Sequence, residues 1–408
     1  MKTVLFSINY TPDMTGTGYY SGVMATELLR RGHGLTVFAA PPFYPEWKLR
    51  KGYRNWRWSR EVIDGVTVYR CPTFIPRRPS GMTRLLHYGS FAFTALLASI
   101  WWRLFHRPDI IFNITPTLFS AIPALFLTKI SKAKSWLHIQ DFEVEAGFAT
   151  GQMRGDGSVA KLAMAFEHRM INRFDFTSSI SMEMCNKLVE KGRDEKTVYE
   201  LRNWSDVDAV FPMTHSAFRS DWNINSQHVA LYSGSITRKQ GIEVVIDAAR
   251  LMQDRNDLIF ILCGSGPTRA ELEESCADLK NIQFHDLQPY EKLGELLALA
   301  TVHLLPQKAD AANLVLPSKL ANMLASGRPV VVGADPATGL AREVNKCGIV
   351  FEPENAEALT QAIAQIIDSP AASAKFSKNA RERAVRYWRR DPIIDALDVE
   401  MKALVNES

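Results

Sequence analysis

The sequence of 408 residues is poor in cysteine, lacks long runs of one charge, and has no apolar leader at its amino terminus. Its five cysteines lie far apart, without a CxxC pair or a cysteine–histidine cluster, which argues against a zinc site and a disulfide framework. The formal net charge of +4 is too small to indicate a nucleic acid partner. Because the first residues enter an apolar strand directly, we expect no signal peptide and a reducing, cytoplasmic location.

Short apolar runs alternate with helical patterns along the whole sequence. Hydrophobic residues make up 46% of the chain and charged residues 23%, the balance of a soluble enzyme of two or three domains. Apolar runs predict strands at 3–8, 34–39, 109–114, 133–139, 175–180, 197–201, 228–232, 258–263, 282–285 and 302–305. Since helical patterns separate these strands, we predict an α/β fold with parallel sheets, and a chain that is helical beyond residue 349.

A loop with two glycines follows the first predicted strand and precedes a helix. Gly16 and Gly18 can bring backbone N–H groups close to a phosphate or a sugar at this position. The pattern is not a full dinucleotide fingerprint, so ordinary turn chemistry remains an alternative.

Two stretches of the first half are rich in aromatic and basic residues. Residues 41–60 are predicted to form a long aromatic loop, which can bind a sugar chain or pack on its own domain. The uncharged run 88–102 is flanked by arginines and ends in Trp101 and Trp102. Fifteen helical residues span only about 22 Å, too short for a membrane crossing. We expect this region to contact an anionic membrane surface, although a fully buried helix would have the same composition.

Acidic residues and a histidine cluster at the carboxyl end of the strand predicted at 133–139. His138, Asp141 and Glu145 lie where open α/β sheets bind their ligands. They can orient or accept hydrogen bonds from sugar hydroxyls, or act as acid and base. Asp141 could also simply cap the segment that follows.

Three loops of the second half combine glycines and basic residues beyond strand ends. In chain order they contain Gly234, Arg238 and Lys239, then Gly264 and Gly266, then Ser318 and Lys319 at the start of a predicted helix. Cations and free backbone N–H groups at such places neutralise phosphates. Each loop alone is compatible with turn chemistry, but their coincidence in one domain favours a cleft for a nucleotide diphosphate.

Asp206 and Asp208 form a DxD pattern, which in some sugar-transferring enzymes holds a divalent cation. Here the pattern follows the last strand of the first half, in polar sequence. We therefore predict a hinge at this position and no metal site.

Taken together, these features resemble the GT-B glycosyltransferases of the family-4 type over nearly the whole length of the chain. The loops at 16–18, 234–241, 264–267 and 325–330 fall in that family's order. Several separated sequence segments resemble those of the colanic-acid fucosyltransferase group: NYTPDMTGTGYYSGVMA, APPFYPEW, RLLHYGSFA, LHIQDFEVEA and LPSKLANMLASG. The resemblance implies two Rossmann-like doubly wound domains facing across a cleft, residues 1–204 for the acceptor and 205–386 for the nucleotide sugar. It also implies a helix at 387–408 that returns to the first domain, and no metal or other cofactor.

The sequence departs from the family pattern at three places. The usual pair of glutamates falls on Leu314 and Asn322, so Asn322 replaces the carboxylate commonly assigned to the ribose. The usual histidine after the mid-domain strand is matched by Gln140. The lysine of the EKG pattern is matched by Gln240, which leaves Lys239 or Arg238 for the phosphates.

The function expected from these residues and the resemblance is that of a retaining glycosyltransferase. Its donor would be a nucleotide sugar, GDP-fucose first, and its acceptor an undecaprenyl-pyrophosphate-linked saccharide at the inner face of the cytoplasmic membrane, in colanic-acid-like exopolysaccharide synthesis. Lys319 and Lys239 would stabilise the leaving pyrophosphate. A GT-B epimerase of nucleotide sugars and a non-catalytic partner subunit remain as alternatives, because the cleft would be similar in each.

Overall fold

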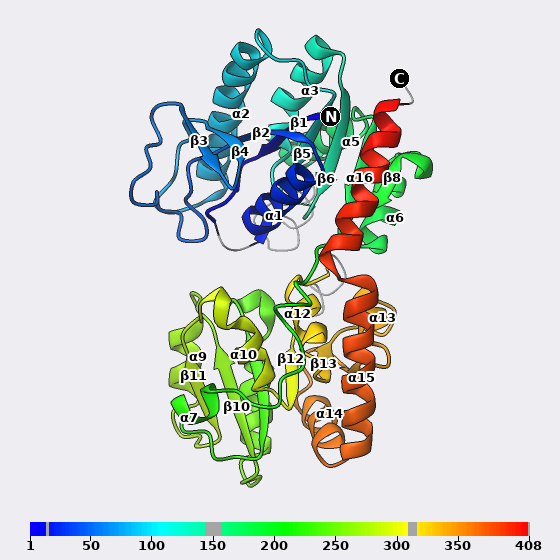
Figure 1. The fold of residues 1–408 in the computed structure, drawn as a ribbon. Coiled ribbons are helices and arrows are strands. Elements are labelled where there is room, and N and C mark those ends of the chain that lie inside the picture. Colours follow the sequence, from blue (N-terminus) through cyan, green and yellow to red (C-terminus); the bar gives the residue numbers. More distant parts are fainter. Residues whose placement is uncertain (14–15, 143–156, 309–315, 407–408) are drawn as a thin grey trace. The chain divides into compact units, whose positions relative to one another are not determined.

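The computed structural model describes residues 1–13, 16–142, 157–308 and 316–406, which form two compact units. Unit 1 contains Met1–Arg202 and Asp391–Ser408, and unit 2 contains Asn203–Arg390. The chain therefore leaves unit 1 after residue 202 and returns after residue 390, compared with predicted domain limits of 204 and 386. Each unit is built around its own sheet (Figure 1).

The sheet of unit 1 has eight strands in the order β3-β4-β2-β1-β5-β6-β7-β8. Its strands are β1 (Lys2–Ser7), β2 (Gly34–Ala39), β3 (Ser59–Ile63), β4 (Val66–Arg70), β5 (Ile110–Ile114), β6 (Lys134–Ile139), β7 (Phe176–Ser179) and β8 (Val198–Glu200). Every pair is parallel except β3 with β4. All five residues of β5 are buried, as expected for a parallel strand covered on both faces.

Helices of unit 1 connect these strands and cover the sheet (Figure 1). They are α1 (Gly16–Arg30), α2 (Gly81–Arg103), α3 (Ala121–Ser131), α5 (Ser158–Ile171), α6 (Met182–Glu190) and α16 (Arg390–Asn406). The last of them, α16, is held on unit 1 by side chains from before β2. His33 bonds Asp398 at 2.7 Å and Thr3 at 3.1 Å, and Arg31 pairs with Asp395 at 2.7 Å.

The predicted aromatic loop 41–60 is wrong at its end, because it runs into an antiparallel hairpin of β3 and β4. Asp64 and Gly65 make the turn, both with positive φ (49° and 83°), as a two-residue hairpin requires. The Asp-Gly signal was present in the sequence but was not used. Arg70 at the end of β4 is fully buried; it pairs with Glu61 at 2.6 Å and donates to the carbonyl oxygen of Thr11.

The helix α2 is longer than the run of fifteen residues predicted for it. It begins after Ser80, which accepts a hydrogen bond from the N–H of Thr83, and its 23 residues span about 34 Å. By length and composition it is the one described helix that could cross a membrane. One face of it is nevertheless core: Trp102 is 4% exposed and stacks on His106, whereas Trp101 is 60% exposed. The expected membrane role of Trp102 is therefore wrong.

The sheet of unit 2 has six strands, all parallel, in the order β11-β10-β9-β12-β13-β14. Its strands are β9 (His228–Ser233), β10 (Leu258–Cys263), β11 (Ile282–His285), β12 (Val302–Leu305), β13 (Val330–Gly333) and β14 (Gly348–Phe351). β14 extends past residue 349, where the sequence predicted only helices. Strand order reverses between β9 and β12, which creates a topological switch point at their carboxyl ends.

The helices of unit 2 flank this sheet (Figure 1). They are α7 (Phe218–Asp221), α8 (Glu243–Leu251), α9 (Arg269–Ser275), α10 (Leu293–Ala298), α12 (Lys319–Ala325), α13 (Gly339–Val344), α14 (Ala356–Ile367) and α15 (Pro370–Tyr387). A buried apolar cluster from β9, β10, α8 and α14 fills the space on one face of the sheet, and a second cluster around α12 and β13 fills another part of the unit.

Candidate nucleotide site

Lys319 lies at the switch point of unit 2, where the loops after β9 and β12 meet. It is the first residue of α12, and its Nζ lies 4.1 Å from the ring centroid of Tyr232, near the end of β9. The same Nζ is 3.5 Å from Oε1 of Gln240. A Cβ built on Gly234, which has a φ of +133°, would lie 3.7 Å from it. Two predicted loop positions, Gly234 and Gln240, and the ring of Tyr232 thus converge on one ammonium group.

The ammonium of Lys319 has no carboxylate partner among the described residues. Burial lowers its pKa to about 7, because the charged form loses hydration that no counter-ion replaces. The tyrosine ring and an amide oxygen offset only part of that loss. The residue itself is only half-buried, so a ligand can reach it. Such a group is suited to bind an anion.

The two glycines after β10 are required by packing between loops. A Cβ on Gly264 would lie 1.8 Å from the carbonyl oxygen of Gly234, and one on Gly266 would lie 1.9 Å from that of Ile236. The N–H of Ile236 donates to the carbonyl of Ser265 at 2.8 Å, which joins the same loops. These glycines let the loops after β9 and β10 stack; their predicted approach to a ligand stays a prediction.

The other predicted cations of unit 2 are exposed. Arg238 and Lys239 lie in a short 3₁₀ turn after β9, and Arg238 is 3.5 Å from Glu271 of α9. Ser318 is exposed at the start of α12, where its side chain makes no capping hydrogen bond. Lys319, by contrast, is half-buried against Tyr232 and Gln240.

Asn322 is one turn further along α12. Its Oδ1 accepts a 2.6 Å hydrogen bond from the hydroxyl of Ser205, so the amide hydrogens are the part that can donate to a ligand. A glutamate at this position would present acceptors instead. The matching position of the other family glutamate, Leu314, lies outside the described residues.

The glycine loop of unit 1 is shaped around an aspartate that the sequence analysis overlooked. A Cβ on Gly18 would lie 2.8 Å from the Cβ of Asp13, whereas Gly16 has a φ of +57° and open space around it. Asp13 is buried at the carboxyl end of β1, and burial raises its pKa to about 6. The signal that could have found it is an aspartate in the loop that follows the first apolar strand, at a sheet's switch point.

His138 does not face the ligand edge as predicted but lies in the core of unit 1, 2% exposed. Burial lowers its pKa to about 3, so the ring is neutral. Its Nε2 is 3.1 Å from the amide nitrogen of Gln140, which can only donate, so Nδ1 carries the proton and donates to Ser178 at 2.9 Å. The same hydroxyl accepts from Trp136 at 2.8 Å. His138 thus orients Gln140, and the carbonyl oxygen of that amide points away from the ring.

The remaining predicted residues divide between described and undescribed segments. Asp141 is partly exposed just beyond β6. Glu145 lies in 143–156, outside the described residues. Asp206 pairs with Arg390 at 3.6 Å and Asp208 with Arg389 at 3.4 Å. No group of three or more potential metal ligands occurs among the described residues.

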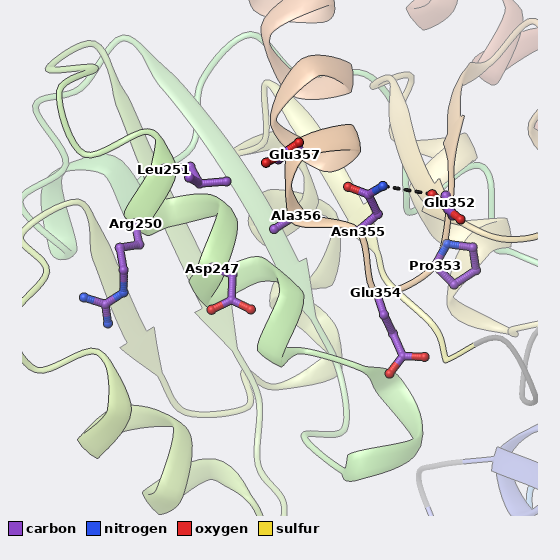
Figure 2. A pocket seen from close by; sticks show the side chains of 9 residues that line it. All are labelled: Asp247, Arg250, Leu251, Glu352, Pro353, Glu354, Asn355, Ala356 and Glu357. Atoms are coloured by element: carbon purple, nitrogen blue, oxygen red, sulfur yellow. Dashed lines mark hydrogen bonds between the residues drawn. The ribbon is translucent and has the colours of Figure 1, made fainter.

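An open hollow of unit 2 lies between α8 and the turn before α14 (Figure 2). Four carboxylates line it, those of Asp247, Glu352, Glu354 and Glu357. Arg250, at one end of it, pairs with Asp278 at 2.5 Å. An acidic hollow of this kind repels a diphosphate and is therefore not a candidate nucleotide site.

Both halves of the chain match family models of sugar transferases. Residues 15–204 match the family described as glycosyl transferase 4-like domain, and residues 215–383 match glycosyl transferases group 1. The chain therefore belongs to this glycosyltransferase family, and its two parallel-sheet units are those of the GT-B fold.

Relatives of known name agree with the family. The chain is 39% identical to the putative colanic acid biosynthesis glycosyl transferase WcaI of Escherichia coli K12, over 97% of this chain and 98% of that protein. Sucrose-phosphate synthase from Thermosynechococcus elongatus superposes over the whole of both chains with a TM-score of 0.78 and 17% identity. WaaG, a glycosyltransferase involved in lipopolysaccharide biosynthesis, superposes with a TM-score of 0.68 and 14% identity over 98% of this chain and 99% of the WaaG chain. The predicted resemblance is confirmed.

Replacing Gly264 with alanine should disrupt the candidate site, because the new methyl group must displace the loop that carries Gly234. We expect a loss of roughly 1–3 kcal/mol in the free energy of unfolding and a weaker affinity for nucleotide sugars. Gly89→Ala is the matched control: its Cβ has open space within helix α2, so it should gain up to about 1 kcal/mol. Denaturant titration and calorimetric binding measure both effects; equal stabilities of the two variants would contradict the loop-packing argument.

Proposed function

We propose that the protein is a retaining glycosyltransferase of colanic-acid-like exopolysaccharide synthesis, with GDP-fucose as the first donor to test and an undecaprenyl-pyrophosphate-linked saccharide as acceptor. The observation that carries the reaction class is the ammonium of Lys319 at the switch point, with no carboxylate beside it in the described chain. The similarity to a relative named for colanic acid biosynthesis supports the pathway.

In this reaction the bond from the anomeric carbon to the donor phosphate breaks while a bond to the acceptor oxygen forms on the same face. The leaving diphosphate gains negative charge as the bond lengthens, and Lys319 stabilises that charge more in the transition state than in the ground state. The acceptor proton passes to the leaving phosphate oxygen. This step needs no strong general base on the protein and no metal ion.

The carboxyl edge of the unit 1 sheet would hold the sugar hydroxyls. Gln140, whose side-chain amide is oriented by His138, replaces the histidine usual in the family at this place. Asp141 follows directly, and both lie beyond β6. These groups would position hydroxyls by hydrogen bonds rather than transfer protons.

We further propose that unit 1 lies on the membrane that holds the acceptor. Helix α2 and the residues after it expose Phe93, Leu97, Trp101, Leu104 and Phe105. Between α2 and β3 the same face contains a hollow of about 760 Å³ lined by Trp58, Tyr69, Leu97 and Trp101. Apolar side chains flanked by Arg103 and Arg107 suit the interface of an anionic leaflet. The proposed location is therefore the cytoplasm, peripheral on the inner face of the cytoplasmic membrane.

Incubation with a panel of nucleotide sugars and an undecaprenyl-pyrophosphate-linked saccharide tests the function. We expect sugar transfer to the lipid with retained anomeric configuration. Lys319→Ala should lower turnover by roughly 10² or more, since one transition-state charge contact is lost. Lys280→Ala, at an exposed position of the same unit, should leave turnover unchanged. Free epimerised nucleotide sugar would instead indicate an epimerase, and binding without any product a partner subunit.

The affinity for a nucleotide sugar should depend on pH through Lys319. The ligand keeps a constant charge between pH 6 and 9, whereas free Lys319 has a pKa of about 7 that the bound diphosphate would raise. Binding must then take up a proton above pH 7, so the affinity should fall by up to about tenfold per pH unit on the alkaline side. Calorimetry in two buffers of different ionisation enthalpy measures the uptake. Lys319→Arg stays protonated and should flatten the profile; an unchanged profile in that variant would exclude Lys319 as the titrating group.

Flotation with vesicles of anionic lipid tests the membrane proposal. We expect the protein to float, and the double variant Trp101→Ser/Phe105→Ser to float several-fold less, because both side chains are exposed. Leu251→Ser, an exposed apolar residue of unit 2, is the control and should float like the parent. If the double variant floats as well as the control, this face is not the membrane-binding surface.

A further inference from the structure

A polar cavity of about 450 Å³ lies in unit 2 at the opposite edge of the sheet from Lys319. Gln227 and Thr301, which line it, stand immediately before β9 and β12, whereas Gly234 and Lys319 follow the carboxyl ends of those strands. Arg328, just before β13, completes this edge. The cavity is therefore separate from the candidate nucleotide site and independent of the proposed function.

The lining of this cavity is positively charged. Arg219 of α7 and Arg328 contribute guanidinium groups, which stay protonated at any ordinary pH. The lining contains no aspartate or glutamate, and in the described chain neither arginine forms an ion pair. Two arginines that face one cavity without a carboxylate form an unbalanced cluster, which a bound anion would neutralise.

Both guanidinium groups are already anchored, with donors left over. Nη2 of Arg328 donates to the carbonyl oxygens of Met213 and Ala298 at 2.8 and 3.1 Å, while its Nη1 makes no hydrogen bond to the described protein. Arg219 donates from Nη1 to the carbonyl oxygen of Ser226 and from Nη2 to that of Gln227, both at 2.8 Å. Its Nε makes no hydrogen bond to the described protein. Since these hydrogen bonds fix both guanidinium groups before any ligand binds, little side-chain entropy is lost on binding.

Two buried polar atoms at this cavity find no partner in the described protein. Nε of Arg328 and Oγ of Ser216 are buried without a hydrogen-bond partner. Burial, and then the positive charge of Arg219, lower the pKa of Arg328 below its usual value. The hydrogen bonds to backbone carbonyls explain how the two arginine side chains are held in position. They do not explain why two positive charges line one cavity that contains no aspartate or glutamate.

We propose that this cavity binds a phosphate-type oxyanion, either inorganic phosphate or the phosphate group of a small monoester such as a hexose phosphate. The arginines supply charge and N–H donors for the oxyanion. The hydroxyl groups of Thr214, Ser216 and Ser220 at the lining suit a polar ligand rather than an apolar one. The volume lies in the range of small-molecule sites and exceeds what a lone phosphate fills.

Calorimetric titration of the full chain with inorganic phosphate, and separately with glucose 6-phosphate, tests the proposal at constant ionic strength. The titrations use the Lys319→Gln protein, so that phosphate cannot bind at the nucleotide site. We expect saturable binding with one site per chain. A monoester affinity about tenfold or more above that of phosphate identifies the monoester as the ligand class, and equal or weaker affinity identifies inorganic phosphate. Absence of saturation with both ligands overturns the proposal.

Variants at the cavity show where the anion binds. Arg328→Gln should weaken binding by about tenfold or more, through the loss of a charged donor. Because this change also removes the hydrogen bonds from Arg328 to Met213 and Ala298, Thr214→Glu provides a second test. It adds a negative charge at an exposed lining position and should weaken binding similarly, whereas Thr214→Gln should not. Arg250→Gln, at an arginine paired with Asp278 elsewhere on unit 2, is the matched control. Equal affinities of Thr214→Glu and Thr214→Gln would place the anion elsewhere and refute the assignment.

Discussion

A half-buried ammonium group that pairs with no carboxylate of the described residues is the constraint on which the candidate site depends. Lys319 is held against the ring of Tyr232, and the positions where the family usually has glutamates carry Leu314 and Asn322. A carboxylate close to the ammonium would pair with it and keep its pKa near the ordinary value. Without one, the folded protein bears the cost of desolvating a charge until a diphosphate arrives. The departure from the family pattern thus has a direct electrostatic consequence for ligand binding.

The parallel sheet of unit 2 explains why its two polar sites are distinct. All carboxyl ends of the strands meet at one edge and all amino ends at the other, so the loops after β9 and β12 converge on Lys319 while the segments before them converge on Arg219 and Arg328. Stacking of the β9 and β10 loops through Gly264 and Gly266 fixes the backbone around the first site. In unit 1 the buried Arg70 has a comparable role, since it joins β4 and β3 to the loop after β1.

Buried strands were the most predictable part of the fold. The strands at 34–39, 258–263, 282–285 and 302–305 were predicted to the residue, because continuous apolar runs bounded by polar turns occur in few other contexts. The hairpin of β3 and β4 was missed, since an exposed edge strand such as β3 has no apolar run, and β14 was taken as part of a helical region. In the site, the sequence predicts Gly234 as a loop residue and Lys319 at the start of a helix, but it does not single out Asp13.

The sequence by itself determined the fold class, the family and the identity of the residues at the strand ends, because these depend on local patterns that can be read along the chain. Only the tertiary structure decided which of two adjacent tryptophans is core and which is surface, that His138 contacts Gln140 rather than a ligand, and that Lys319 lies against an aromatic ring with no acid beside it among the described residues. Burial and pKa are set by side chains from elements distant in sequence. A linear pattern identifies a charged residue, but the dielectric environment and the partners of that charge exist only after the strands have assembled.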